Sequence, residues 1–124
     1  MKNCTAVLLG LVSCIGWGAA LWAGEADVLN AEARRDSDGT FRFSVTLRHD
    51  DAGWDHYADR WDVLALDGTV LATRVLLHPH VGEQPFTRSL SGVEIPPTNR
   101  EVIIRGGDSV HGFGGAELLL ALPE

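Results

Sequence analysis

Apolar and polar side chains alternate with a period of two between residues 40 and 48. Every second residue of this segment is large and apolar, and the residues between them are Thr, Arg or Ser. That period places all the apolar side chains on one face, so it indicates a β-strand with one face in a core and the other in water. Because such a strand needs a second layer to cover its apolar face, we expect a packed sheet.

Six further segments are typical of short strands separated by turn signals. The clearest turn is Asp67-Gly68, since both residues tolerate positive φ. No stretch of the chain after residue 26 shows a convincing 3.6-residue period. The sequence therefore predicts an all-β fold, a seven-stranded antiparallel sandwich of immunoglobulin-like or fibronectin-III-like type, with Trp61 in the core between the sheets. The expected strands are residues 28–35, 40–48, 61–66, 70–77, 86–93, 101–105 and 117–122.

The first 26 residues are predicted to be a secretory signal peptide. Lys2 precedes an uncharged run over residues 5–23, and small residues flank Glu25. This pattern favours cleavage after Ala26, with Ala23 or Ala20 as alternative positions. We therefore expect a signal peptide at residues 1–26 and a sandwich domain at residues 27–124, in a periplasmic or secreted protein.

Two other interpretations of the N-terminal segment stay open. The uncharged run is long enough to span a bilayer as an anchor. Residues 11–14, Leu-Val-Ser-Cys, resemble the lipobox of bacterial lipoproteins, which would leave a lipidated Cys14. Contact with a membrane is expected only if the N-terminus is lipidated or anchored in one of these ways.

The predicted exported domain contains no cysteine, methionine or lysine, because those residues all lie within the first 14 positions. Without disulfides, its stability must come from packing alone. The whole chain has a formal net charge of −7 at pH 7. An acidic surface repels nucleic acid and is permissive for cations, so no nucleic-acid partner is expected.

All five histidines are predicted to lie at the same end of the sandwich. Consecutive antiparallel strands alternate in direction, so every second connection emerges at the same end. The loops at residues 49–58, 78–85 and 108–115 share one end, and the three remaining turns share the other. Those three loops contain His49, His56, His78, His80 and His111. Imidazoles that are distant in sequence but converge in space are typical of a metal site or a recognition surface.

A metal site at this end is expected to use His78 and His80, with one or two of the other three histidines. Pro79 fixes its own φ and holds His78 in extended geometry, so the two rings point the same way. Nitrogen and oxygen donors without sulfur suit Zn(II) or Cu(II). Nearby carboxylates can ligate the ion or orient a ligating histidine, and the candidates are Asp51, Asp55, Glu83 and Asp108.

Other interpretations of the same loops remain. In one, the histidines and aspartates only cap turns and bond local amides. In another, Trp54 and Tyr57 form a non-catalytic module that binds an envelope protein or a glycan. Against that module, the slightly favoured expectation is that Trp54 folds back over the end of the sandwich.

No enzymatic activity is expected. Asp108, Ser109 and His111 are close in sequence, but their spacing does not by itself arrange a serine, its base and an orienting acid in a relay. Nothing in the chain resembles the strand-to-helix elbow that carries the nucleophile of G-x-S-x-G hydrolases.

Three segments carry a resemblance to other proteins: GWDHYADRWDV at residues 53–63, HPHVGEQPFTRSL at 78–90 and DSVHGFGG at 108–115. They resemble a group of uncharacterised small exported proteins of Gram-negative bacteria that carry the same segments in the same order. The similarity spans nearly the whole predicted domain. The resemblance implies an exported location and a shared fold, and it implies no mechanism or ligand set.

Overall fold

The structure, a computed structural model, describes residues 24–124. Most of the predicted signal peptide, residues 1–23, lies outside the described residues. The described part forms seven strands: β1 (Asp27–Arg35), β2 (Phe41–Arg48), β3 (Ala58–Leu64), β4 (Val70–Val75), β5 (Phe86–Val93), β6 (Glu101–Asp108) and β7 (Leu118–Ala121). It contains no helix that is long and apolar enough to cross a membrane.

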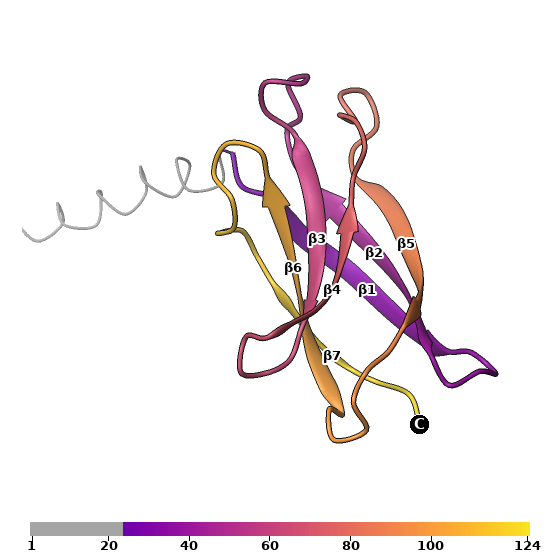
Figure 1. Cartoon of the computed structure of the whole chain (residues 1–124). Helices are drawn as coiled ribbons and strands as arrows, with labels where there is room; N and C mark the ends of the chain where they lie inside the picture. Colours follow the sequence, from indigo (N-terminus) through magenta and orange to yellow (C-terminus); the bar gives the residue numbers. More distant parts are fainter. Residues whose placement is uncertain (1–23) are drawn as a thin grey trace, which may run out of the picture.

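The strands form two antiparallel sheets that pack face to face (Figure 1). One has the order β1-β2-β5 and the other the order β4-β3-β6-β7. The predicted seven-stranded sandwich is confirmed. In a constant-type immunoglobulin domain the fourth strand pairs within the sheet of the first two; here β4 pairs with β3 in the opposite sheet.

The core confirms the alternation that predicted β2. Along this strand Phe41, Phe43, Val45 and Leu47 are all buried, and the residues between them are half-buried or exposed. Trp61 on β3 is completely buried, as expected for a residue between the sheets. Apolar burial of this kind stabilises the sandwich in proportion to the area removed from water.

The end of β6 differs from the sequence prediction. The expected strand ends at Arg105, whereas β6 continues through Gly106 and Gly107 to Asp108. A Cβ on Gly106 would lie 3.0 Å from the Leu47 side chain, and one on Gly107 would lie 3.0 Å from the Phe113 ring. These glycines therefore serve close packing within a strand rather than a turn. The strand β3 also begins three residues earlier than expected, at Ala58.

Residues 24–26, which the sequence assigned to the signal peptide, pack on the sandwich. Ala26 is only 1% exposed and belongs to the hydrophobic core. Directly after it, Val28 N–H donates to the Ala116 carbonyl, and Ala116 N–H donates to the Asp27 carboxylate. Cleavage after Ala26 would remove a core side chain, and cleavage after Ala23 or Ala20 would not. We call residues 24–26 the N-terminal arm.

The connections between strands separate into two groups (Figure 1). The turns β1–β2, β3–β4 and β5–β6 lie at one end of the sandwich. The loops β2–β3, β4–β5 and β6–β7 lie at the other end and carry all five histidines. We call this end the histidine pole. The up-and-down course of the chain thus brings together loops that are far apart in sequence, as predicted.

Truncating the central core residue tests the packing. We expect Trp61→Ala to lower the free energy of unfolding by about 3–5 kcal/mol, because it removes a buried aromatic side chain and leaves a cavity. Trp61→Phe should cost less, since no group among residues 24–124 hydrogen-bonds the indole N–H. Urea unfolding followed by circular dichroism measures both losses. Equal losses for the two variants would contradict the packing described.

Candidate metal centre

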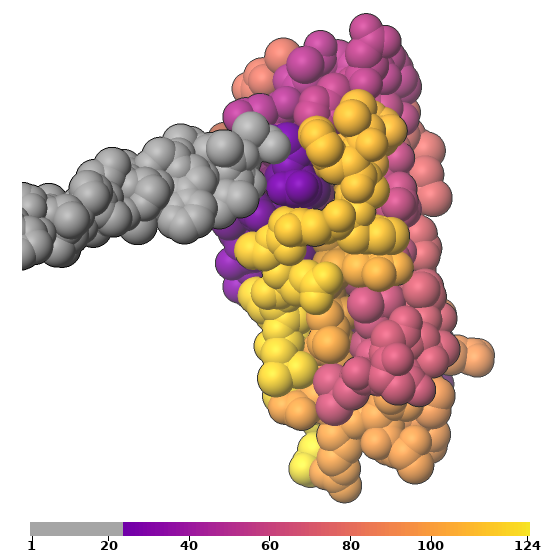
Figure 2. Space-filling model, turned by 90° about the vertical axis from the view of Figure 1, so that its left-hand side faces the viewer, coloured from indigo at the N-terminus to yellow at the C-terminus, as the bar shows by residue number. Residues whose placement is uncertain are grey.

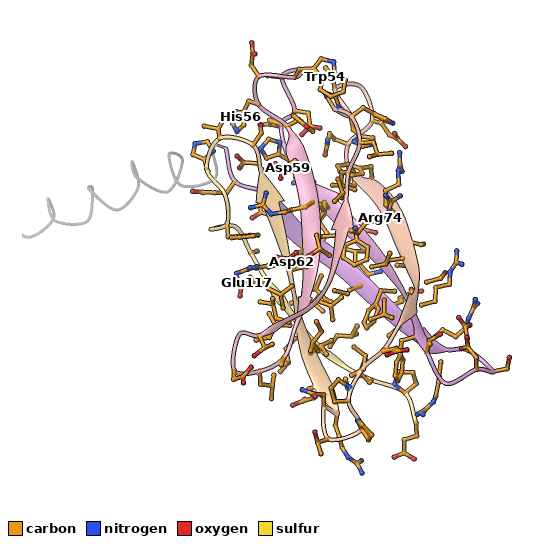
Figure 3. The ribbon with its side chains drawn as sticks, in the orientation of Figure 1. Trp54, His56, Asp59, Asp62, Arg74 and Glu117 are labelled. Atoms are coloured by element: carbon orange, nitrogen blue, oxygen red, sulfur yellow. The ribbon has the colours of Figure 1, made fainter. Side chains whose placement is uncertain are left out.

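Three side chains from different segments converge at the histidine pole. His49 directly follows β2, His56 lies in the β2–β3 loop, and Asp108 is the last residue of β6. One nitrogen or oxygen atom from each lies within 4.8 Å of the others. His49 and Asp108 are each 2% exposed, whereas the His56 side chain is 25% exposed. Figure 3 shows His56 at this end of the molecule. The group is therefore anchored in the core and open to solvent on one side.

His111 extends this group. Its Nδ1 lies 3.3 Å from Asp108 Oδ2, and its ring centroid lies 4.9 Å from that of His56. The His56 ring in turn lies 4.7 Å from the His49 ring, edge to face. The three imidazole rings are thus neighbours of one another and all lie close to the Asp108 carboxylate. We call His49, His56, His111 and Asp108 the His–Asp cluster.

A main-chain oxygen lies within the same cluster. The Gly24 carbonyl oxygen is 2.8 Å from His49 Nε2, 3.1 Å from His56 Nε2 and 3.0 Å from His111 Nδ1. Three ring nitrogens from three histidines therefore face a single oxygen of the N-terminal arm. No sequence pattern predicts this contact, because Gly24 lies inside the predicted signal peptide.

Asp51 holds His49 in a fixed orientation. The Asp51 carboxylate is buried; its Oδ1 accepts hydrogen bonds from His49 Nδ1–H (2.5 Å) and from Ala58 N–H (3.0 Å). Its Oδ2 accepts the backbone N–H of His80 at 2.7 Å. With Nδ1 donating to this carboxylate, His49 turns Nε2 toward the cluster. An outer carboxylate that bonds the second ring nitrogen is the usual way in which proteins orient a ligating histidine.

Asp108 is held as a carboxylate. Its Oδ1 accepts the backbone N–H groups of Val110 (2.8 Å) and His111 (2.6 Å), which forms a tight turn directly after β6. Burial by itself would raise the pKa of Asp108. The two amide hydrogen bonds and the charges of His49 and His111 outweigh it, so the pKa lies below its ordinary value of 3.8. An anionic carboxylate that retains a second oxygen facing the imidazoles suits cation binding.

His78 and His80 form a separate pair. Their rings lie 4.7 Å apart, and neither belongs to the group around Asp108. His80 stacks on Phe86 at 3.9 Å, and its Nε2 accepts a hydrogen bond from Arg88 Nη2 at 2.9 Å. That bond takes up Nε2 of His80. The sequence analysis predicts His78 and His80 as the main ligands of the metal site. In the structure, both residues lie outside the His–Asp cluster.

The environment of His80 disfavours its charged form. Burial, and then the positive charges of Arg88 and His78, lower the pKa of His80 below its ordinary value of 6.5, against smaller opposing effects of Asp51 and Glu83. Its Nδ1 is buried, and no group of residues 24–124 forms a hydrogen bond with it. The nearest carboxylate oxygen, Asp51 Oδ2, is 4.0 Å away. His80 therefore packs as a neutral ring beside the carboxylate that orients His49.

The remaining candidate residues lie outside the cluster. Glu83 pairs with Arg88 at 3.5 Å, and Asp55 is exposed. Trp54 is 66% exposed, lies edge-on to the Tyr57 ring, and stands at the tip of the pole (Figure 3). The expectation that Trp54 folds back over the sandwich is therefore wrong.

Phe113 is a supporting residue that the sequence analysis missed. Its ring is covered by the Arg105 guanidinium at 3.5 Å and the Arg60 guanidinium at 4.4 Å. These cation–π contacts fix the β6–β7 loop against the face of its own sheet. Because His111 lies two residues earlier in that loop, the contacts also limit where its ring can lie.

The chain is similar in sequence to a known protein. A protein of Halomicrobium mukohataei named "Putative lipoprotein" is 43% identical over 96 residues, which cover 77% of this chain and 47% of the relative. The chain thus spans about half the length of the curated relative it matches. No family model matches the chain, and no solved structure matches it.

Removing the Asp51 carboxylate tests its structural role. We expect Asp51→Ala to lower the free energy of unfolding by about 3 kcal/mol or more, since it leaves two backbone N–H groups and the His49 ring without their buried acceptor. The neighbouring exposed Asp50 offers a matched control, and Asp50→Ala should change stability by about 0.5 kcal/mol or less. Urea unfolding at pH 7.5 measures both. Similar values for the two variants would show that Asp51 does not join these segments.

The lowered pKa of His80 predicts a pH dependence of stability. Between its folded and unfolded pKa values the unfolded chain binds more protons, so stability is full above about pH 6.5 and falls as the pH drops toward the folded value. His80→Gln should remove this part of the dependence. The measurement is the difference in unfolding free energy between wild type and variant, at pH 7.5 and at pH 5.5. A difference that does not change with pH would contradict the prediction.

Proposed function

We propose that the His–Asp cluster binds a divalent transition metal ion, Zn(II) or Cu(II). The supporting observation is the convergence of ligand atoms from His49, His56 and Asp108 within 4.8 Å. Bonds of 2.0–2.1 Å in a tetrahedral site put two donors about 3.3 Å apart. The Asp108 oxygens lie 3.5 Å from His49 Nε2, 3.5 Å from His56 Nε2 and 3.3 Å from His111 Nδ1. Each of the three imidazoles therefore stands at about the distance from an Asp108 oxygen that separates two ligands of one ion.

The orientation of His49 supports the same function. Asp51 engages its Nδ1, so Nε2 is the nitrogen left to coordinate. A carboxylate, a histidine and a metal in series raise the basicity of the ring and fix its tautomer. In this proposal Asp51 is a positioning residue and does not touch the ion.

A hydrogen-bond network without an ion is the alternative explanation of the cluster. A carbonyl oxygen has two lone pairs, and three ring nitrogens face the one oxygen of Gly24 within 3.1 Å. In such a network two of these nitrogens would donate to Gly24, and His111 Nδ1 would donate to Asp108 Oδ2 at 3.3 Å. A cation among the nitrogens would replace these hydrogen bonds, so metal titration distinguishes the two explanations.

The proposed setting is the cell envelope. The name of the Halomicrobium mukohataei relative and the apolar run over residues 5–23 both favour an exported protein, either free or attached through its N-terminus. There the protein would buffer a transition metal or deliver it to a partner.

Exposed apolar side chains favour a second candidate function. Trp54, Leu77, Val81 and Val110 all lie in loops of the histidine pole and are 57–73% exposed. Large exposed aromatic and aliphatic side chains are typical of surfaces that bind another protein or a glycan. In this alternative the cluster only stabilises the loops that carry the surface.

Metal titration of the purified, chelator-stripped chain tests the proposal. We expect calorimetry to show one Zn(II) or Cu(II) ion per chain, and the melting temperature to rise, because a ligand at 100 times its Kd stabilises the folded state by about 2.7 kcal/mol. His56→Ala should weaken binding at least tenfold, since it removes a ligand that is partly exposed and contributes little to the core.

His78→Ala is the matched control, because it removes an exposed histidine of the same pole. It should leave the affinity unchanged. No binding of either ion would overturn the proposal and leave the partner-binding surface ahead. Loss of binding in His78→Ala but not in His56→Ala would move the site to the His78–His80 pair.

A further inference from the structure

We propose that the Gly24 carbonyl oxygen is itself a ligand of the metal, so that metal binding fixes the N-terminal arm onto the histidine pole. This inference rests on the proposed metal function of the His–Asp cluster. It adds a main-chain donor from a segment that precedes the first strand. It also makes the order of that segment depend on the ion.

The distances around Gly24 support a ligand role. Its oxygen lies 2.8–3.1 Å from three ring nitrogens, and the Asp108 oxygens lie 3.3–3.5 Å from the same nitrogens. Donors on one tetrahedral ion stand about 3.3 Å apart. The carbonyl oxygen therefore lies beside all three imidazoles, as Asp108 does, and it would move away from them by only about 0.2–0.5 Å to become a further ligand of the same ion.

The orientation of the His49 ring supports the same conclusion. Because Nδ1 lies against the Asp51 carboxylate, Nε2 is the nitrogen that faces the Gly24 oxygen, at 2.8 Å. A metal ion that coordinates Nε2 would therefore be bound on the side of the ring where the carbonyl oxygen lies.

The N-terminal arm packs closely against the β6–β7 loop, and this packing determines where the Gly24 carbonyl lies. A Cβ on Gly115 would clash with the Ala26 oxygen, so the β6–β7 loop can approach the arm only because that residue is glycine. A Cβ on Gly24, whose φ is +104°, would clash with the His111 ring. Figure 2 shows the first described residues, in indigo, beside the yellow β6–β7 segment. The close approach of the arm to the histidine pole therefore requires glycine both in the arm, at Gly24, and in the facing loop, at Gly115.

Isotope labelling tests the ligand role without changing the protein. The dipeptide Gly-Glu occurs twice in the chain, at Gly24-Glu25 and at Gly82-Glu83. Labelling glycine with ¹³C at the carbonyl and glutamate with ¹⁵N therefore gives only two carbonyl–nitrogen correlations. We expect Zn(II) to shift the Gly24 carbonyl resonance and to leave that of Gly82 unchanged, since Gly82 lies in an exposed part of the β4–β5 loop of the same pole.

A pair of variants gives an independent measure. Gly24→Ala drives a methyl group into the His111 ring and displaces the carbonyl, so Zn(II) affinity should fall at least tenfold. Gly39→Ala is the control. Gly39 also has a positive φ, +88°, but lies in a turn at the opposite end with no atom within 4 Å of an added Cβ, so its affinity should match that of the wild type.

The outcomes separate the two proposals. If Zn(II) binds and His56→Ala weakens it, while the Gly24 resonance does not move and Gly24→Ala binds like Gly39→Ala, the carbonyl is not a ligand and the metal site stands without it. If Zn(II) does not bind the wild-type chain, the metal function fails and this inference fails with it.

Discussion

The buried carboxylate of Asp51 joins three segments that the course of the chain alone would leave independent. It accepts the ring N–H of His49 at the end of β2, the backbone N–H of Ala58 at the start of β3 and the backbone N–H of His80 in the β4–β5 loop. Because these bonds lie in a low-dielectric interior, each is stronger than in water, and an unpaired partner would be costly. The loops of the histidine pole are thereby held together from inside.

The His–Asp cluster combines two buried residues at strand ends with two partly exposed residues in loops. His49 and Asp108 stand at strand ends and are almost fully buried, so the two sheets set their separation. His56 and His111 come from loops, and their side chains are 25% and 37% exposed. Side chains on regular elements are more exactly placed than side chains on loops, and an ion bound at the proposed site would have to enter from solvent. The cluster combines placed residues with accessible ones.

The sequence predicted the fold and the histidine pole, but not the grouping of the histidines. Alternation in β2 and the antiparallel parity of the loops depend only on local chemistry, and both are confirmed. The division of five imidazoles into a cluster around Asp108 and a separate pair depends on long-range contacts, above all on Arg88 donating to His80. The predicted strand ends at Arg105, before Gly106 and Gly107, because glycine pairs are more typical of turns. Only the approach of Leu47 and Phe113 shows why the strand needs glycine there.

The position of Gly24 determines how the domain would be oriented on a membrane. Gly24 lies at the histidine pole, so an anchor or a lipid joined through the preceding residues would attach the sandwich at that end. The turns at the opposite end would then face away from the membrane. If Cys14 carries a lipid, nine residues lie between it and Gly24. Even fully extended, the ten steps from Cys14 to Gly24 reach only about 35 Å. A tethered molecule would then keep its cluster close to the bilayer surface, where it would meet ions and neighbours confined to that layer before those in the bulk compartment.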